Sequence, residues 1–162
     1  MVRPPVRLFL QLFICCLPFC GNAQTFLYAG NGHYFDTPVL RIEGDRCMPP
    51  FSYNINDAFY TVTKNVITEG PSRSEFDIVY TLRENKVYEG TAMYTSQIRY
   101  TFENGLIFKG NSTFRLDAVL NVKDNVIYKG ADPFPGDAIY FIDGPYTAAH
   151  LFAALLSLGL LM

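Results

Sequence analysis

The chain has 162 residues, of which 49% are hydrophobic and 17% are charged, and its formal net charge is −2. This length allows one domain with one sizeable hydrophobic core. The slight acidity argues against a nucleic-acid-binding protein, because such proteins present clustered basic surface.

The first 23 residues have the pattern of a signal peptide. Arg3 and Arg7 form a basic segment, residues 8–19 are an apolar run, and residues 21–23 are small residues before a cleavage point. We therefore expect cleavage after Ala23 and export, either to the periplasm or out of the cell. An uncleaved membrane anchor is the alternative interpretation.

The next segment, residues 24–146, is built from a 20-residue repeat. The same ending returns at residues 67–70, 87–90, 107–110 and 127–130 as I/V-x-x-G. A fixed period of this length is the signature of a repeat architecture. The units are 31–50, 51–70, 71–90, 91–110, 111–130 and a partial unit, 131–143. The first unit is degenerate and ends in Pro49-Pro50 instead of glycine.

Each unit reads as one antiparallel hairpin, most clearly residues 77–90 (DIVYTLRENKVYEG). Hydrophobic residues alternate with a period of two, which is typical of a half-buried strand, so we expect Ile78, Tyr80 and Leu82 to face inwards. Two-residue turns follow at Lys64-Asn65, Glu84-Asn85, Asn104-Gly105 and Asp124-Asn125. Asn-Gly is the strongest short hairpin signal, because a type I′ turn needs positive φ at both central residues. Leu82 should then pair with Val87 on the inner face, and Thr81 with Tyr88 on the outer face.

The two ends of the repeat region carry strands without a partner. Residues 26–29 could pair with residues 138–142, which would seal the sheet and remove its exposed edges. The predicted fold is therefore all-β, a closed or nearly closed antiparallel barrel of about 10–12 strands. Such a barrel has a lumen wide enough for a helix, which is ~10 Å across. An open solenoid of hairpins and a propeller with two repeats per blade are the alternatives.

The C-terminal segment, residues 147–162 (TAAHLFAALLSLGLLM), is apolar and rich in the helix formers Ala and Leu. It is short for a bilayer span, which needs ~20 residues. We expect a helix in the centre of the barrel, belonging to the same domain, in which Ala148, Ala149, Ala153 and Ala154 allow close approach. A membrane anchor is the competing interpretation, and this segment is the only one through which the mature chain would associate with a membrane.

A family resemblance covers roughly residues 53–156. The units IVYTLRENKVYEG, IRYTFENGLIFKG and KGNSTFRLDAVLNVKDNVIYKG resemble the repeats of bacterial β-flower proteins. The resemblance implies hairpins arranged about a pseudo-symmetry axis, and it brings no known activity or catalytic residue. A barrel around an apolar helix is also similar in shape to tubby-like and scramblase proteins, which makes a lipid-associated barrel an alternative function.

Cys47 is the only cysteine left after the predicted cleavage, so no intramolecular disulfide can form. It falls at the repeat position that Ile67, Val87, Ile107 and Ile127 occupy, and we interpret it as a small core residue. With Arg3 and Arg7 removed, 11 basic residues face 15 acidic ones, which leaves a net charge of −4.

One repeat position before the first strand of a unit holds carboxylates, namely Asp57, Asp77, Asp117 and Asp137. A ring of carboxylates could bind a hard cation. We favour local hydrogen bonds to backbone amides where the chain turns into its strand, since points on so wide a ring lie too far apart to share one ion.

Two sets of aromatic residues also recur. Tyr60, Tyr80, Tyr100 and Tyr140 are expected to pack on the central helix. Tyr88, Phe108 and Tyr128 should lie on the outer, wet face and form a candidate ligand or partner surface. Cross-strand pairing with Thr81, Thr101 and Asn121 is the alternative explanation for the second set.

No motif for catalysis or cofactor binding is present. The histidines, His33 and His150, lack the cysteine neighbours of an ordinary zinc site, and the glycines are too widely spaced for a phosphate-binding loop. We therefore expect no cofactor, no metal and no catalytic residues. The sequence predicts an exported, non-enzymatic protein that is a structural or binding module of the cell envelope or extracellular space. Its ligand or partner is unknown.

Overall fold

The computed structural model describes residues 23–32, 37–91 and 93–161. The predicted signal peptide therefore lies outside the described residues except for Ala23, as does His33.

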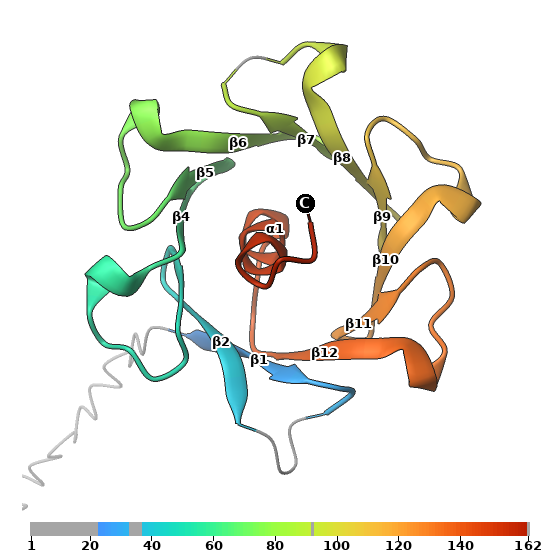
Figure 1. Ribbon diagram of the computed structural model, residues 1–162, viewed down its shortest axis with the longest axis horizontal. Coiled ribbons are helices and arrows are strands. Elements are labelled where there is room, and N and C mark those ends of the chain that lie inside the picture. The colour runs from blue at the N-terminus through green and yellow to red at the C-terminus, as the bar shows by residue number, and fades with distance from the viewer. Residues whose placement is uncertain (1–22, 33–36, 92, 162) are drawn as a thin grey trace, which may run out of the picture.

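Within the described residues, twelve antiparallel strands form one closed barrel in which every strand pairs with its neighbours in sequence (Figure 1). Strand β1 pairs with β12, with Phe26 opposite Asp143, so the two ends of the repeat region make the sixth hairpin and confirm the predicted closure. The strands are β1 (Gln24–Ala29), β2 (Pro38–Glu43), β3 (Arg46–Met48), β4 (Tyr60–Thr63), β5 (Val66–Glu69), β6 (Ile78–Arg83), β7 (Lys86–Glu89), β8 (Ile98–Glu103), β9 (Leu106–Lys109), β10 (Ala118–Lys123), β11 (Val126–Lys129) and β12 (Ala138–Asp143).

The hairpin register agrees with the prediction. Leu82 lies opposite Val87 and Thr81 opposite Tyr88, across the two-residue turn. Both central residues of the Asn104-Gly105 and Asp124-Asn125 turns have positive φ, as a type I′ turn requires. At the turns that begin with Lys64 and Glu84, positive φ occurs only at the first central residue.

Strict alternation fails at the start of the long strands, which corrects the predicted inner face. The register shifts between Ile67 and Thr68, so that Ile67 lies opposite Tyr80 while Thr68 lies opposite Ile78. Val79 is the extra residue of this β-bulge and packs on the core, whereas Ile78 joins the outer face beside Thr68. The same shift occurs at the β7–β8, β9–β10 and β11–β12 pairs. A bulge keeps two successive side chains on one side of the sheet, which a period of two cannot express.

The hairpins are joined by loops that project outwards from the ring, and we call these loops petals (Figure 1). The petals are residues 50–57, 70–77, 90–97 without residue 92, 110–117 and 130–137. Each contains a short 3-10 helix, which the sequence analysis did not predict. These helices are η1 (Ile55–Asp57), η2 (Glu75–Asp77), η3 (Thr95–Gln97), η4 (Arg115–Asp117) and η5 (Pro135–Asp137).

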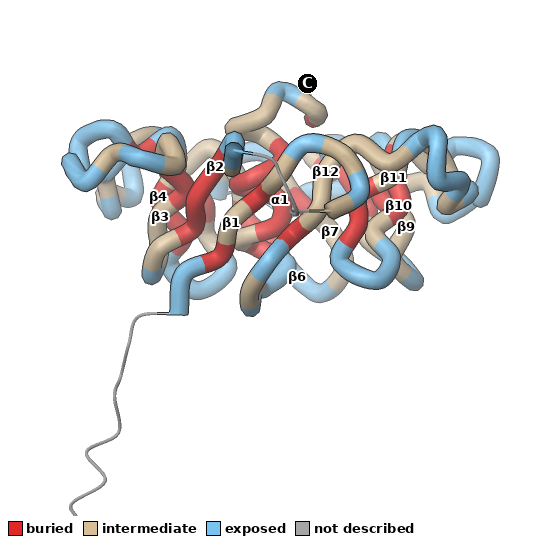
Figure 2. The backbone as a smooth tube through the Cα atoms, turned by 90° about the horizontal axis from the view of Figure 1, so that it is seen from below, coloured by how far each residue is buried: buried red, intermediate tan, exposed pale blue. Residues whose placement is uncertain are grey.

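Buried hydroxyl groups on the outer face fasten the petals to the barrel. The side chains of Thr61, Thr81 and Thr101 donate hydrogen bonds of 2.7–2.8 Å to the carbonyl oxygens of Gly70, Gly90 and Gly110, where the petals begin. These threonines are at most 7% exposed although they point away from the barrel centre. The outer face is therefore covered, and the wet surface lies on the petals and rims (Figure 2).

Helix α1 (Ala148–Ser157) runs through the middle of the barrel (Figures 1 and 2). The Thr147 side chain caps its first turn by accepting from the His150 amide. At its other end Gly159 has a φ of +68°, and the Leu160 amide donates to the Leu155 carbonyl, which is a Schellman termination.

The helix supplies the centre of the core. Leu151, Phe152 and Leu155 are at most 2% exposed and pack against a ring of inward residues from the strands, each contributing roughly 1.5–3 kcal/mol by burial. The predicted plug is confirmed, and the apolar face of this segment is not available to lipid. Ala149, Ala153 and Ala154 are buried as expected, but Ala148 is exposed.

Among the described residues, no helix has the length and apolar character needed to cross a membrane.

Candidate functional site

The repeated aspartates end the 3-10 helices of the petals and act locally. Asp57, Asp77 and Asp117 accept hydrogen bonds of 2.5–2.6 Å from the serine hydroxyl five residues earlier. Each of these serines in turn accepts a backbone amide two residues further along, at 3.0–3.2 Å. The partners are thus serine hydroxyls where backbone amides were expected. Asp137 is exposed and follows Asp132 in place of the serine.

The described residues contain no group of three or more His, Cys, Asp or Glu side chains that could hold a metal ion. The aspartates are spread around the ring on separate petals.

The inward tyrosines are part of the core, as predicted. Tyr100 is 6% exposed, and its ring centre lies 6.4 Å from that of Phe152. Tyr60, Tyr80 and Tyr140 are half-buried and pack against the same cluster. Burial first, and then the nearby Glu69 carboxylate, raise the pKa of Tyr60.

The aromatic residues expected on a wet outer face lie beneath the petals. Phe108 is only 2% exposed, so the expected exposure is wrong for this residue. Tyr88 and Tyr128 are half-buried. Thr101 lies opposite Phe108 and Asn121 opposite Tyr128, as the cross-strand alternative predicted. The burial arises because the petals cover the sheet, and the alternation pattern contains no information about loops.

Large apolar side chains are instead exposed on the petals themselves. Phe76 is 98% exposed, Tyr53 84% and Leu116 82%. Every described petal carries at least one such residue; the set is Phe51, Tyr53, Ile55, Phe76, Met93, Tyr94, Phe114, Leu116 and Phe134. Sequence reasoning missed these residues. The available signal was an apolar residue in each segment between the closing glycine and the next strand, where no strand pattern explains it.

Grooves separate neighbouring petals. One groove of about 610 Å³ lies above β5 and β6 and is lined by Lys64, Arg73, Glu75 and Met93 among others. A groove of about 500 Å³ lies at the corresponding place above β9 and β10 and includes Arg115. The side chains that line the two grooves differ. The repeat therefore places a groove at both positions, but the charged and apolar residues in each groove are not the same.

Ion pairs connect the petals to their surroundings. Arg73 binds Asp45 in the β2–β3 turn, and Arg115 binds Asp132 in the following petal. Both arginines are more than half exposed, and surface pairs of this kind contribute about 0–1 kcal/mol.

The petal formed by residues 50–57 is attached to the barrel by a buried cation, Arg41. Arg41 occupies the position that threonine fills in three other units, and it is 2% exposed. Its guanidinium lies 3.1 Å from the Glu43 carboxylate and donates to the Ser52 carbonyl, while Tyr53 stacks on it at 5.0 Å. The Nε atom of Arg41 is buried without a hydrogen-bond partner. Arg41, which belongs to the unit whose sequence departs most from the repeat, thus fixes the petal formed by residues 50–57.

Cys47 and His150 lie close together at the beginning of the helix. Burial raises the pKa of the Cys47 thiol to about 12, so the thiolate that reactive cysteines use is suppressed. The Cys47 sulfur lies 3.9 Å from the His150 carbonyl oxygen. Burial also lowers the pKa of His150, against the opposing effect of Asp45. Cys47 is a member of the core cluster, and His150 is half-buried.

The closed barrel of six hairpins, with petals around it and a helix within, defines a class of repeat protein with pseudo-sixfold architecture. A family model described as "6-fold beta flower protein" matches residues 27–155. The chain therefore belongs to the β-flower family, as its repeats suggested. Neither a curated protein nor a solved structure matches the chain.

Proposed function

We propose that this β-flower protein is an exported, non-enzymatic binding module that docks a protein of the cell envelope through its petals. The observation that carries this proposal is the large exposed apolar side chain on every described petal. Exposed apolar patches mark interaction sites, whereas isolated exposed apolar residues are common; here the repeat places such a side chain on every described petal. A ring of them gives several contacts to one partner.

The composition of the petals favours a protein partner. Aromatic side chains with arginines beside them are the residues that dominate protein–protein binding energy. Arg73 and Arg115 lie on the petals with Phe76 and Phe114. The acidic net charge disfavours attraction to anionic lipid or nucleic acid.

Two further observations support the other parts of the proposal. The basic and apolar segments within residues 1–23 support export. The repeated polar residues hold petals in place, through the serine–aspartate and threonine–glycine hydrogen bonds, which gives these side chains a structural role.

The binding test uses envelope fragments from the source cell and the chain from Gln24 onwards. We expect the protein to sediment with the fragments. The triple variant Phe76→Ser, Phe114→Ser, Phe134→Ser should bind at least about tenfold more weakly, because each change removes an exposed contact and little folding energy. Thr63→Ala with Glu103→Gln, at the exposed ends of β4 and β8, is the matched control and should bind normally.

Digestion of the envelope proteins separates the possible partners. Loss of binding after protease treatment supports a protein partner. Undiminished binding to digested fragments or to vesicles of the extracted lipid would contradict the proposal and favour the lipid-associated alternative. Equal binding by the triple variant would also contradict it. Export is checked separately by sequencing the amino terminus of the processed protein, where Gln24 is expected.

A further inference from the structure

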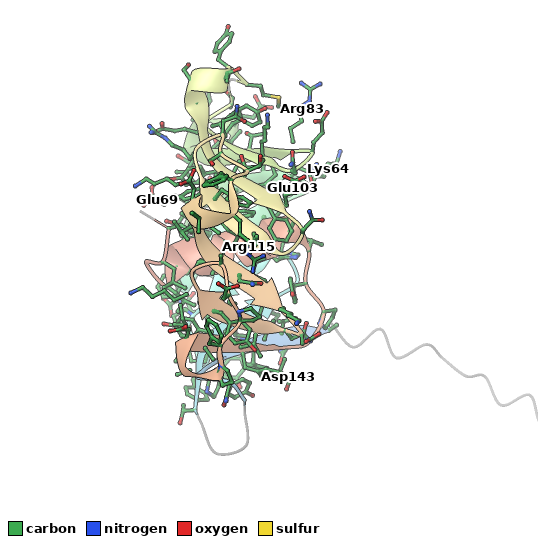
Figure 3. All side chains as sticks on the ribbon, turned by 90° about the vertical axis from the view of Figure 1, so that its right-hand side faces the viewer. Lys64, Glu69, Arg83, Glu103, Arg115 and Asp143 are labelled. Carbon is green, nitrogen blue, oxygen red and sulfur yellow. The ribbon has the colours of Figure 1, made fainter. Side chains whose placement is uncertain are left out.

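The two rims of the barrel differ, and one of them carries segregated charge. The turn rim holds the two-residue turns. The opposite rim, which we call the C-terminal rim, is where the petals begin and where the chain ends after α1 (Figure 2). Glu69 lies at the C-terminal rim, whereas Lys64, Arg83, Glu103 and Asp143 lie at the turn rim (Figure 3).

One exposed charge ends each of four consecutive short strands at the C-terminal rim. Glu69 and Glu89 end β5 and β7, and Lys109 and Lys129 end β9 and β11. All four are exposed. Because the strands follow one another around the barrel in this order, the glutamates form an acidic arc and the lysines an adjacent basic arc. Ala29 and Pro49 occupy the two equivalent positions on the remaining side and are uncharged.

These six positions are complementary to themselves, and the exposed Arg99 at the start of β8, between β7 and β9, is paired with Glu89 of its own chain. A two-fold axis lying in the plane of the rim, between β7 and β9, places Glu89 of one copy on Lys109 of the other, and Glu69 on Lys129. The same axis places Ala29 on Pro49, so no like charges meet among the six equivalent positions. A two-fold interface uses the same patch on both subunits and requires this kind of self-complementarity.

We propose that the protein forms a face-to-face homodimer through the C-terminal rim. The centre of this face is apolar, because Leu156, Leu158 and Leu160 are only partly buried and Gly159 is exposed. An apolar centre within a ring of charge is the usual anatomy of a protein interface. At the turn rim, charges of both signs alternate within and between hairpins, as at Arg83-Glu84 and Lys123-Asp124.

The outer pair of the interface gives the cleaner test. Glu89 already accepts a 2.8 Å hydrogen bond from Arg99 of its own chain, whereas Glu69 and Lys129 form no ion pair among the described residues. The test therefore reverses Glu69 and Lys129 in separate variants and leaves Glu89 and Lys109 in place.

Sedimentation equilibrium measures the association of the chain from Gln24 onwards, which contains every strand and the helix that the structure describes. We expect wild type to be dimeric and to dissociate as salt is raised, since salt screens surface charge. Glu69→Lys alone and Lys129→Glu alone should each associate at least about tenfold more weakly, because each places like charges opposite one another. An equimolar mixture of the two variants should regain dimers, because the lysine introduced into one chain would meet the glutamate introduced into the other.

Matched controls sit at the turn rim, where Glu103→Lys and Lys64→Glu make the same changes of net charge and should leave association unchanged. A wild type that stays monomeric at every concentration would overturn the proposal. So would a mixture that fails to recover, or controls that weaken association as much as the rim variants. Circular dichroism of each variant shows that the fold is intact, and these exposed substitutions are expected to preserve it.

Discussion

At the scale of single residues, one position in each hairpin determines the inner wall of the barrel. Leu27, Cys47, Ile67, Val87, Ile107 and Ile127 occupy it, and all are at most 2% exposed. Residues that face outwards from the strands attach the petals. Thr61, Thr81 and Thr101 are buried polar residues whose hydroxyl groups form hydrogen bonds to the petals. A buried hydroxyl is tolerated only when it is hydrogen-bonded, so these threonines fix where three of the petals start.

The pH dependence of stability provides a test at this scale. Burial holds the pKa of His150 below its ordinary value of about 6.5. Below about pH 6.5 the unfolded chain therefore binds more protons at this site than the folded chain does. The free energy of unfolding consequently decreases as the pH is lowered. The fall should level off once pH has passed below the pKa of the folded state.

Chemical denaturation between pH 5 and pH 8 measures this effect. The variant His150→Gln, which does not titrate, should show a smaller decrease of unfolding free energy between about pH 7 and pH 5. An identical pH profile for wild type and variant would show that His150 titrates alike in the folded and unfolded chain.

At the scale of elements, the β-bulges and the central helix define the core together. The bulge turns Val79 inwards beside Tyr80, and Val119 and Ile139 pack on the core at the equivalent positions, whereas Arg99 of β8 is exposed. The helix makes different contacts on its two sides. Cys47 lies beside the His150 carbonyl on one side, and Phe152 contacts Tyr100 and Phe102 on the other. Phe152 is thus the largest helix side chain that fills the space towards β8.

The same substitution at two sites tests this assignment. Phe152→Ala should lower the free energy of unfolding by about 3–5 kcal/mol, because it leaves a cavity in the core. Phe76→Ala, at a fully exposed petal position, should change it by less than about 0.5 kcal/mol. Urea denaturation measures both. Equal effects at the two positions would contradict the central packing of α1.

At the scale of the whole molecule, closure and filling of the barrel depend on each other. Pairing of β1 with β12 removes the open edges of the sheet, and the helix occupies the lumen that a twelve-stranded barrel leaves. The chain between Asp143 and the helix turns sharply at Gly144, which has a φ of +122° and lies against β1. The closing strand and the plug are therefore joined by one short connection.

Removal of the plug should abolish the native state. A chain ending at Tyr146 retains all strands but exposes an inner wall of apolar side chains to water. We expect it to lose cooperative thermal unfolding and to bind a hydrophobic dye, whereas the full chain melts in one transition. A truncated chain with an unchanged melting temperature would mean that the barrel is stable without its helix.

The repeat, the hairpin register, the closure by the two terminal strands and the position of the helix could be predicted from the amino-acid sequence. These features follow from local signals: a period of two, turn residues between strands, a fixed 20-residue spacing and one apolar segment with no other place to be buried. The sequence also predicted Tyr100 as core and Cys47 as a small buried residue, because both recur at inward positions.

The course of the petals, the bulge that turns Val79 inwards in place of Ile78, and the burial of Phe108 depend on contacts between hairpins. The arcs of charge at the C-terminal rim and the exposed Phe76 likewise became visible only when the hairpins closed into a ring. The physical reason is that a strand pattern records which side of the sheet a residue faces. Whether that side is then covered depends on loops from neighbouring hairpins, and such contacts between units are absent from any local pattern.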